Sequence, residues 1–232
     1  MSRRVSATPS APLPREFYAR PVLEVAPELI GCVVAHGRST GVIVETEAYL
    51  ESEPACHAFA GLTPRTRTLF GPPGRAYVYR SYGVHALLNA VCEPEGVGAA
   101  VLIRALEPAS GVARMRARRG PIGDRPARDS ELCSGPGKLT QALGIGLHDD
   151  GRSLSGGPLR ILAPAEAWRD PVIVQGVRVG ITRAVELRWR FCAGGNGHVS
   201  RPRPPGLNPA RRNPTAARGR GRGSRSARSP RA

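Results

Sequence analysis

The stretch Gly41–Leu50, GVIVETEAYL, has the alternation of apolar and polar residues that predicts a β-strand. Because successive side chains of a strand point to opposite faces, Glu47 and Tyr49 share one face. A carboxylate partly removed from water beside an aromatic ring has a raised pKa and can act as a base near neutral pH. Two ordinary glutamates on a solvated edge strand are the alternative. The two faces would carry Val42, Val44, Thr46 and Ala48 on one side and Ile43, Glu45, Glu47 and Tyr49 on the other.

Further along the chain, Tyr77–Arg80 and Val84–Val91 predict two strands around the short turn Ser81-Tyr82-Gly83. A tyrosine at the tip of a hairpin has nothing to pack against, whereas it is well suited to insertion into a stack of bases. Tyr82 is therefore a candidate wedge.

Four of the five tyrosines, at positions 49, 77, 79 and 82, fall within 34 residues. Tyr77 and Tyr79 would share one face of their strand. Aromatic side chains with arginines between them suit stacking on bases and binding of phosphates, although Tyr77 and Tyr79 could equally be plain core residues. The interleaved arginines are Arg65, Arg67, Arg75 and Arg80.

Other segments predict short elements and no internal repeat. The expected elements are one or two helices in 15–30, a strand in 31–38, a loop over 51–75, a strand in 97–106, a helix in 109–119, a helix from the N-cap Ser134 to Leu143 closed by Gly144, and several short apolar runs in 158–191.

A chain of 232 residues suggests one domain with tails or two small domains. Its 28 glycines and 23 prolines indicate many turns, some disorder, or both. We expect a disordered lead at 1–14, a folded body at 15–200 and a disordered, arginine-rich tail at 201–232.

The formal charge of +16 is unevenly distributed. Ten arginines and no acidic residue lie in 201–232, which leaves the body with 24 basic and 18 acidic residues, a net charge of +6. Lys138 is the only lysine, and such a skew is also what a GC-rich genome produces. Charge therefore favours a nucleic-acid partner without establishing one.

Several classes of protein are disfavoured. The five cysteines form no CxxC pair, which argues against a disulfide framework and a cysteine zinc site and favours a reducing cytosol. No apolar run approaches the ~18 residues of a membrane span, and the first residues lack the apolar core of a signal peptide. His57 is a lone loop histidine without the signature of a zinc deaminase. The segment Leu132–Leu139 resembles a phosphate loop only superficially, although its helix start could still receive a backbone phosphate.

Five segments occur in one order along the chain: VETEAYL at 44–50, TPRTRTLFGPPGRAYVYRSYGVHALLN at 63–89, VLIRALEP at 101–108, ELCSGPGKLTQALGI at 131–145 and RVGITRAVELRWRF at 178–191. Together they resemble the alkyladenine (3-methyladenine) DNA glycosylase family over about Arg15 to Ser200. The resemblance implies a monomeric α+β protein, a single mixed domain with a curved antiparallel sheet and a DNA-inserting hairpin. It also implies excision of alkylated or deaminated purines from double-stranded DNA without a metal or cofactor, by base flipping and attack of water at C1′.

The resemblance also implies roles for individual residues, and it alone selects Glu47 over Glu45. Glu47 matches the general base, and Arg104 and the carbonyl of Val179 match the contacts of the attacking water. Tyr49, His57 and Tyr79 match residues that sandwich the flipped base, and His57 also matches a donor to its edge. Tyr82 matches the residue that fills the gap in the duplex, and Asn89 matches a pocket residue that screens purines bearing an exocyclic amine.

Thr66, Arg188 and Gly197 depart from the family pattern, outside the matched catalytic set, and bear on pocket shape and DNA-backbone contacts. The resemblance leaves the preferred lesion and the role of the tail open. Two other classes remain as alternatives: a noncatalytic nucleic-acid-binding protein of the same fold, and an RNA-modifying or tRNA-binding protein.

Overall fold

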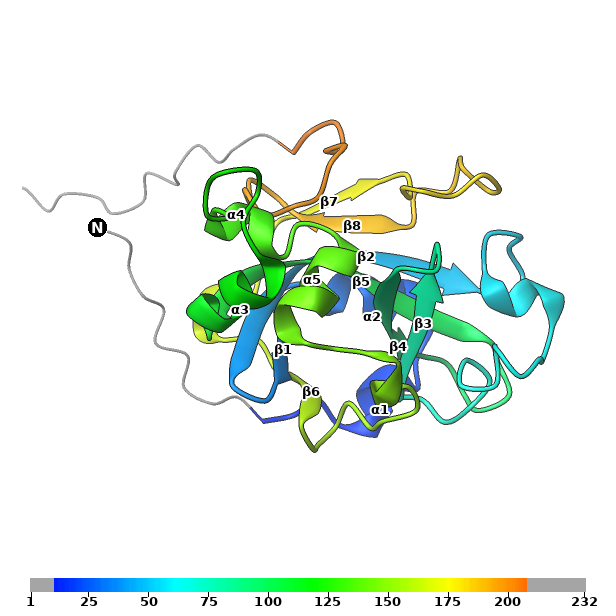
Figure 1. Cartoon of the computed structure of the whole chain (residues 1–232). Helices are drawn as coiled ribbons and strands as arrows, with labels where there is room; N and C mark the ends of the chain where they lie inside the picture. Colours follow the sequence, from blue (N-terminus) through cyan, green and yellow to red (C-terminus); the bar gives the residue numbers. More distant parts are fainter. Residues whose placement is uncertain (1–10, 208–232) are drawn as a thin grey trace, which may run out of the picture.

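An eight-stranded antiparallel sheet forms the centre of the structure, a computed structural model that describes residues 11–207. The strand order is β3-β4-β5-β2-β1-β6, with β8 beside β2 and β7 beside β8 (Figure 1). The strands are β1 (Val33–His36), β2 (Ser39–Leu50), β3 (Ala76–Ser81), β4 (His85–Val91), β5 (Ala99–Ser110), β6 (Leu159–Leu162), β7 (Ile173–Gly176) and β8 (Arg190–Ala193).

The sheet is curled, and β2 has two neighbours along one edge. Its first half pairs with β1, from Ser39 to Val42, and its second half pairs with β8, from Glu45 to Glu47. The opposite edge pairs with β5 along its whole length. The expected α+β fold with a curved antiparallel sheet is confirmed.

Five α-helices and three 3₁₀-helices complete the described part of the chain. Helix α2 packs on β2 and β5, and α5 packs on β4 and β5, so the apolar core lies between these helices and the sheet. The helices are α1 (Arg15–Tyr18), α2 (Val22–Glu28), α3 (Val112–Arg119), α4 (Asp129–Leu132), α5 (Pro136–Leu143), η1 (His57–Ala60), η2 (Leu147–Asp149) and η3 (Glu166–Trp168).

Strand β2 is buried on both faces, so the alternative of a solvated edge strand is wrong. Thr46 donates a hydrogen bond to the carbonyl of Ala26 in α2. The pairing between β2 and β5 skips Val44 on one strand and Arg104 on the other. Such bulges redirect side chains, and this one accompanies the position of Arg104 between two glutamates described below.

The predicted hairpin is present as β3 and β4, with Ser81 paired to His85 across the turn. Tyr82 and Gly83 both have positive φ angles, 49° and 70°. Glycine adopts this region freely, whereas tyrosine rarely does. The Tyr82 side chain is 91% exposed at the tip.

The other predicted elements are found with shifted ends. Two short helices, α1 and α2, occupy 15–30. The helix expected at 109–119 starts at Val112 because β5 continues to Ser110. Ser134 is not the N-cap of α5: Gly135 takes that position and Pro136 opens the helix, where its missing N–H costs nothing.

Packing extends a few residues beyond the expected body of 15–200. Leu13 is buried in the core, and Pro12 forms a β-bridge with Leu162. Beyond Ser200, Pro204 and Leu207 are buried. The rest of the expected lead and tail, residues 1–10 and 208–232, lies outside the described residues.

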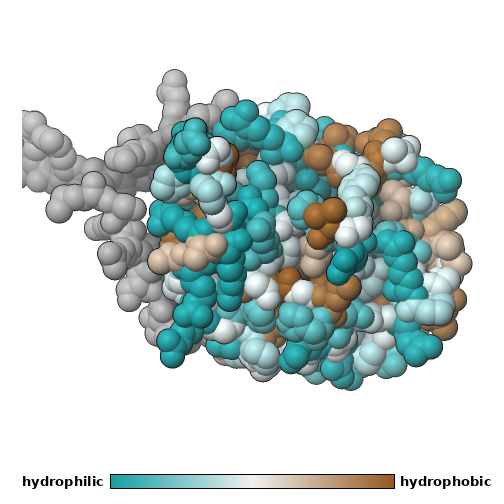
Figure 2. All heavy atoms as spheres, viewed as in Figure 1, coloured by the Kyte–Doolittle hydropathy of each residue, from teal (hydrophilic) through white to brown (hydrophobic). Residues whose placement is uncertain are grey.

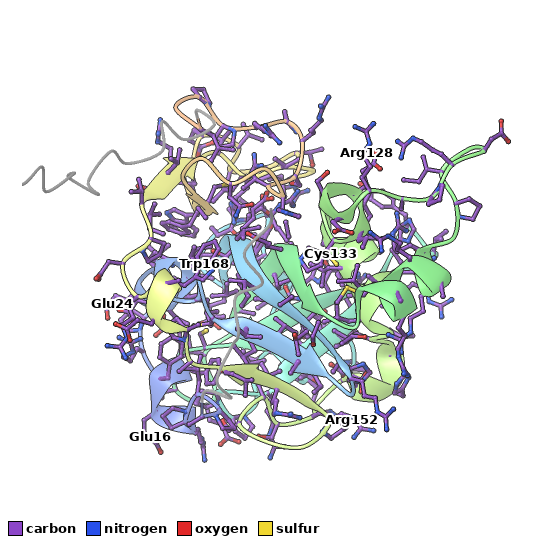
Figure 3. The ribbon with its side chains drawn as sticks, turned by 90° about the vertical axis from the view of Figure 1, so that its left-hand side faces the viewer. Glu16, Glu24, Arg128, Cys133, Arg152 and Trp168 are labelled. Atoms are coloured by element: carbon purple, nitrogen blue, oxygen red, sulfur yellow. The ribbon has the colours of Figure 1, made fainter. Side chains whose placement is uncertain are left out.

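All five cysteines are free and buried. Figure 3 shows Cys133 within the body, while Glu16, Glu24, Arg128 and Arg152 lie towards its edges. Hydrophilic residues predominate on the face in Figure 2, with apolar residues in scattered groups. Between residues 11 and 207, no helix has the length and apolarity needed to cross a membrane, and no cluster of three or more histidine, cysteine or acidic side chains could hold a metal ion.

Candidate active site

A cavity of about 760 Å³ opens between the hairpin of β3 and β4, the loop that follows β2, the loop over residues 179–183 and the start of α5. The hairpin and the two loops lie on the right-hand side of Figure 1. Segments far apart in the sequence thus form one site. Seven of the eight expected site residues line the cavity: Tyr49, His57, Tyr79, Tyr82, Asn89, Arg104 and Val179.

One wall of the cavity is aromatic. The rings of Tyr77 and Tyr79 stack with centroids 5.3 Å apart, and His57 meets Tyr79 edge-on at 4.5 Å. His57 Nδ1 also lies 3.1 Å from the Tyr77 hydroxyl. Tyr77 was not among the expected base contacts, yet it supports both His57 and Tyr79. Tyr77 is buried in a small apolar cluster and Tyr79 packs against it, and both rings also line the cavity.

Asn89 lies on β4 directly opposite Tyr77. Its Nδ2 donates a hydrogen bond of 3.0 Å to the Tyr77 carbonyl, which fixes the orientation of the amide. The side chain is buried but lines the cavity, so it restricts what the cavity can accept.

Glu47, the eighth expected residue, is fully buried directly behind the lining. Its Oε1 accepts a 2.7 Å hydrogen bond from the Val179 N–H. Its Oε2 accepts hydrogen bonds from the Tyr49 hydroxyl at 2.9 Å and from Arg104 Nη1 at 3.1 Å. A carboxylate offers about four acceptor positions. Three protein donors therefore leave one position on Glu47 unfilled.

Glu45 lies two residues earlier on the same strand and is equally buried. Its Oε1 accepts from Arg104 Nε at 2.9 Å, from Arg190 Nε at 2.8 Å and from the Ser200 hydroxyl at 2.8 Å. Its Oε2 accepts from the Ser200 N–H at 2.6 Å. Glu45 therefore has four protein donors, three on Oε1 and one on Oε2, whereas Glu47 has three.

The two glutamates differ in pKa because they have different charged neighbours. Burial raises the pKa of Glu47 above the ordinary value, and Arg104 and the Val179 amide only partly oppose this effect. Burial also acts on Glu45, but Arg104 and Arg190 outweigh it and hold that pKa below the ordinary value. A raised pKa favours proton acceptance near neutral pH, and the two carboxylates, which the strand pattern treats alike, differ in the direction of their pKa.

Arg104 connects the two glutamates with the cavity. Besides the bonds already described, its Nη1 lies 3.4 Å from the Val179 carbonyl and its Nη2 lies 3.3 Å from the Ser200 hydroxyl. Its side chain is almost fully buried but lines the cavity. The side chain therefore presents a positive charge beside the buried carboxylate.

Arg178, which the sequence analysis did not single out, forms a buried ion pair with Glu53, with N–O distances of 2.6 and 2.9 Å. Its guanidinium lies over the rings of Tyr49, at 4.6 Å, and Trp189, at 5.3 Å. Arg178 thus supports the Tyr49 ring and the chain next to Val179. Its position immediately before Val179 was the only available signal.

Basic residues surround the mouth of the cavity. Of the four interleaved arginines, Arg65 and Arg80 line it, and Arg67 and Arg75 do not. Other lining residues with basic side chains are His85, Arg119, Lys138 and Arg183. The exposed Tyr82 stands among them, so positive charge and an exposed aromatic ring occupy the same rim.

The three departures from the family pattern are accommodated locally. Thr66 accepts from the Thr63 N–H at 2.8 Å and donates to the Gly61 carbonyl at 2.9 Å. Arg188 donates to the Gln175 carbonyl at 2.7 Å. A Cβ added at Gly197 would meet nothing within 4 Å, so the position has room for a larger residue.

Comparison with known proteins agrees with this geometry. The family model of methylpurine-DNA glycosylase matches residues 16–197. Three relatives bear the name "Putative 3-methyladenine DNA glycosylase". That of Rhodopseudomonas palustris (strain ATCC BAA-98 / CGA009) is 53% identical over 192 residues, which cover 83% of this chain and 89% of the relative. That of Bradyrhizobium diazoefficiens is 51% identical over 193 residues (83% and 92%), and that of Methanoculleus marisnigri is 50% identical over 194 residues (82% and 98%).

The match covers the strand that carries Glu47, the aromatic hairpin, Arg104 and the Val179 segment. The chain therefore belongs to the methylpurine-DNA glycosylase family and is a hydrolase of the N-glycosidic bonds that hold alkylated purines in DNA.

Proposed function

We propose that this enzyme flips an alkylated or deaminated purine out of double-stranded DNA into the aromatic cavity and that water, activated by Glu47, attacks C1′ of its deoxyribose. Extrusion is needed because the glycosidic bond of a stacked base is out of reach inside a duplex. The enzyme then has three tasks: to hold the flipped base, to fill the gap in the duplex and to position a base with its water.

The unfilled acceptor position of Glu47 carries the proposal. A buried carboxylate with a raised pKa and one open position can accept a proton from water. As water adds to C1′, its proton passes to Glu47 and the purine leaves with the electrons of the glycosidic bond. The carboxylate also stabilises the positive charge that develops on the sugar.

Arg104 and the Val179 carbonyl are proposed to hold this water. Arg104 Nη1 and the Val179 carbonyl oxygen lie 3.4 Å apart. Arg104 also donates a hydrogen bond to Glu47, and so does the N–H of Val179. A carbonyl accepts a hydrogen bond from one O–H of the water, and a guanidinium donates a hydrogen bond to the water oxygen. The remaining proton then points towards the carboxylate.

Tyr49, His57 and Tyr79 are proposed to stack on the flipped base, with His57 donating to its edge. An N-alkylated purine is cationic, so it is attracted to aromatic faces and is already a good leaving group. Asn89 is proposed to discriminate against purines with an exocyclic amine, since its amide is fixed by Tyr77 and cannot turn to suit every base edge.

Tyr82 is proposed to insert into the duplex at the place that the base leaves. Its side chain is almost fully exposed on a tight turn beside the cavity. The arginines at the rim would then bind the phosphates on either side.

Oligomeric state, cofactors and cellular compartment are part of the same proposal. The enzyme is proposed to act as a monomer, without a metal or cofactor, and to leave the DNA strand intact. Five free cysteines support a reducing compartment such as the bacterial cytosol.

Duplexes that each carry one defined lesion test the proposal by measurement of base release. Release of free purine from at least one alkylated duplex is expected. Binding without release would instead support a noncatalytic nucleic-acid-binding protein, and preference for tRNA over duplex DNA in competition would support an RNA-directed one.

A further inference from the structure

Arg65 reaches into the aromatic wall of the cavity from the loop after β2. Its guanidinium carbon lies 5.7 Å from the centroid of the Tyr79 ring, and its Nη2 lies 3.5 Å from His57 Nε2. Arg65 is an exposed residue, so this cation contacts the wall without being buried in it.

These contacts determine how His57 carries its proton. Burial and the charge of Arg65 lower the pKa of His57, which keeps the ring neutral with a single N–H. An arginine can only donate hydrogen bonds. His57 Nε2 therefore accepts from Arg65, and the ring proton lies on Nδ1, which donates to the Tyr77 hydroxyl at 3.1 Å.

We propose that Arg65 is a specificity-determining residue: it holds His57 as a hydrogen-bond acceptor and must release Nε2 before a flipped base can receive a hydrogen bond from it. The proposal rests on the function proposed above, in which His57 contacts the edge of the base. On release, the ring proton moves from Nδ1 to Nε2, and the Tyr77 hydroxyl reverses to donate to Nδ1. One proton changes place, and none is gained or lost.

The charge of Arg65 makes this release unequal between lesions. A cationic base such as 7-methylguanine competes with the guanidinium for the same aromatic rings and is repelled by it. A neutral base such as hypoxanthine has only to replace the hydrogen bond. Arg65 thus acts against cationic bases relative to neutral ones.

The first test measures the tautomer directly, in protein without DNA. In ¹⁵N spectra of the histidine side chains, wild-type His57 is expected to carry its proton on Nδ1. In Arg65→Met, which keeps a long apolar side chain and removes the donor, the population with the proton on Nε2 is expected to rise. Arg67→Met is the matched control, since Arg67 lies two residues away and does not line the cavity. An unchanged His57 signal in Arg65→Met would overturn the proposal.

The second test compares lesions. Arg65→Met is expected to raise the ratio of kcat/KM on 7-methylguanine to that on hypoxanthine by roughly two- to fivefold, the scale of one exposed charge contact. Both bases are placed at the same position of one duplex, so any lost contact of Arg65 with a phosphate cancels in the ratio. An unchanged or lowered ratio contradicts the proposal. If wild-type enzyme released neither base, the proposed function would fail, while the ¹⁵N measurement would still test the hold of Arg65 on His57.

Discussion

Glu45 and Glu47 lie two residues apart on one strand and share a single guanidinium, that of Arg104, through distances of 2.9 and 3.1 Å. The two carboxylates have different further partners. Glu45 also accepts hydrogen bonds from Arg190 and from both the N–H and the hydroxyl of Ser200. Glu45 is thereby fixed as an ionised group that anchors Arg104. Glu47 has three protein donors, all from residues that line the cavity: Tyr49, Arg104 and Val179.

Glu47→Gln is expected to reduce single-turnover base excision by ~10²–10⁴-fold, the contribution of a positioned general base. The amide keeps the size of the side chain, so binding to damaged DNA should be retained. Quench assays of excision and gel-shift titrations on the same duplex measure the two effects. A near-wild-type rate would eliminate Glu47 as the base.

Glu45→Gln serves as the comparison for this variant. It removes the charge that Arg104 and Arg190 both need, and breaking a buried ion pair by removing one partner costs about 3–5 kcal/mol. We therefore expect a clearly lower Tm for Glu45→Gln than for Glu47→Gln. The reverse order of stabilities would mean that Glu47, and not Glu45, is the main anchor of Arg104.

The pH dependence of excision follows from the raised pKa of Glu47. Only the carboxylate form can take a proton from water, so the rate should fall as pH decreases through this pKa. The acid limb is expected above the pKa of about 4.3 of an ordinary glutamate. Hypoxanthine is the suitable lesion, because it stays neutral over this range. A limb at or below the ordinary value, or one that persists in Glu47→Gln, would contradict the assignment.

The sequence was most informative where the pattern is local. Alternation located β2, and the tyrosines around a glycine turn located the hairpin. Ends of elements were less accurate, because they depend on partners elsewhere in the chain: β5 continues to Ser110 opposite Thr40, which delays the start of α3. The N-cap of α5 was predicted one residue too early, at Ser134. Pro136 occupies the first helical position, which makes Gly135 the N-cap.

In the candidate site, too, local patterns were informative and contacts between distant residues were not predicted. The resemblance supplied its residues and selected Glu47 over Glu45, whereas the different surroundings of the two carboxylates depend on long-range contacts that no local pattern predicts. The bond from Val179 joins residues 132 positions apart, and those from Ser200 to Glu45 join residues 155 apart. Arg178 was missed because an arginine before Val179 looks no different from the other arginines of the chain until its stacking on Tyr49 is known.

Tyr82→Ala is expected to weaken binding to a lesion-containing duplex by ~1–3 kcal/mol, the size of one stacking contact. A base that is already unpaired needs less help to leave the stack and should show a smaller loss. Val84→Ala is the control, because Val84 is also exposed near the hairpin tip, at 73%, but has no ring to stack. Equal losses on single-stranded and duplex DNA would argue against insertion of Tyr82.

Two truncations distinguish the arginine-rich tail from the end of the fold. Removal of residues 208–232 deletes eight arginines and should weaken binding to undamaged DNA and lower its salt dependence, while Tm and excision at low salt persist. Removal of 201–232 also deletes the buried Pro204 and Leu207 and should lower Tm. Identical salt dependence with and without 208–232 would exclude a phosphate-binding role for the tail.

Base removal without strand cleavage is the last expectation. Glycosylases that also cut the backbone attack C1′ with an amine and pass through a Schiff base, which borohydride reduces to a stable adduct. Lys138, the only lysine of the chain, requires this test because it lines the same cavity as Arg104 and Val179. It lies, however, in the exposed first turn of α5, whereas the groups that contact Glu47 are Tyr49, Arg104 and Val179. Water beside Glu47 is therefore the expected nucleophile. Borohydride added during turnover should trap no protein–DNA adduct, a chelator should leave the rate unchanged, and Lys138→Ala should still release the base. An adduct that forms with wild-type enzyme and disappears in Lys138→Ala would replace the water mechanism with an amine mechanism.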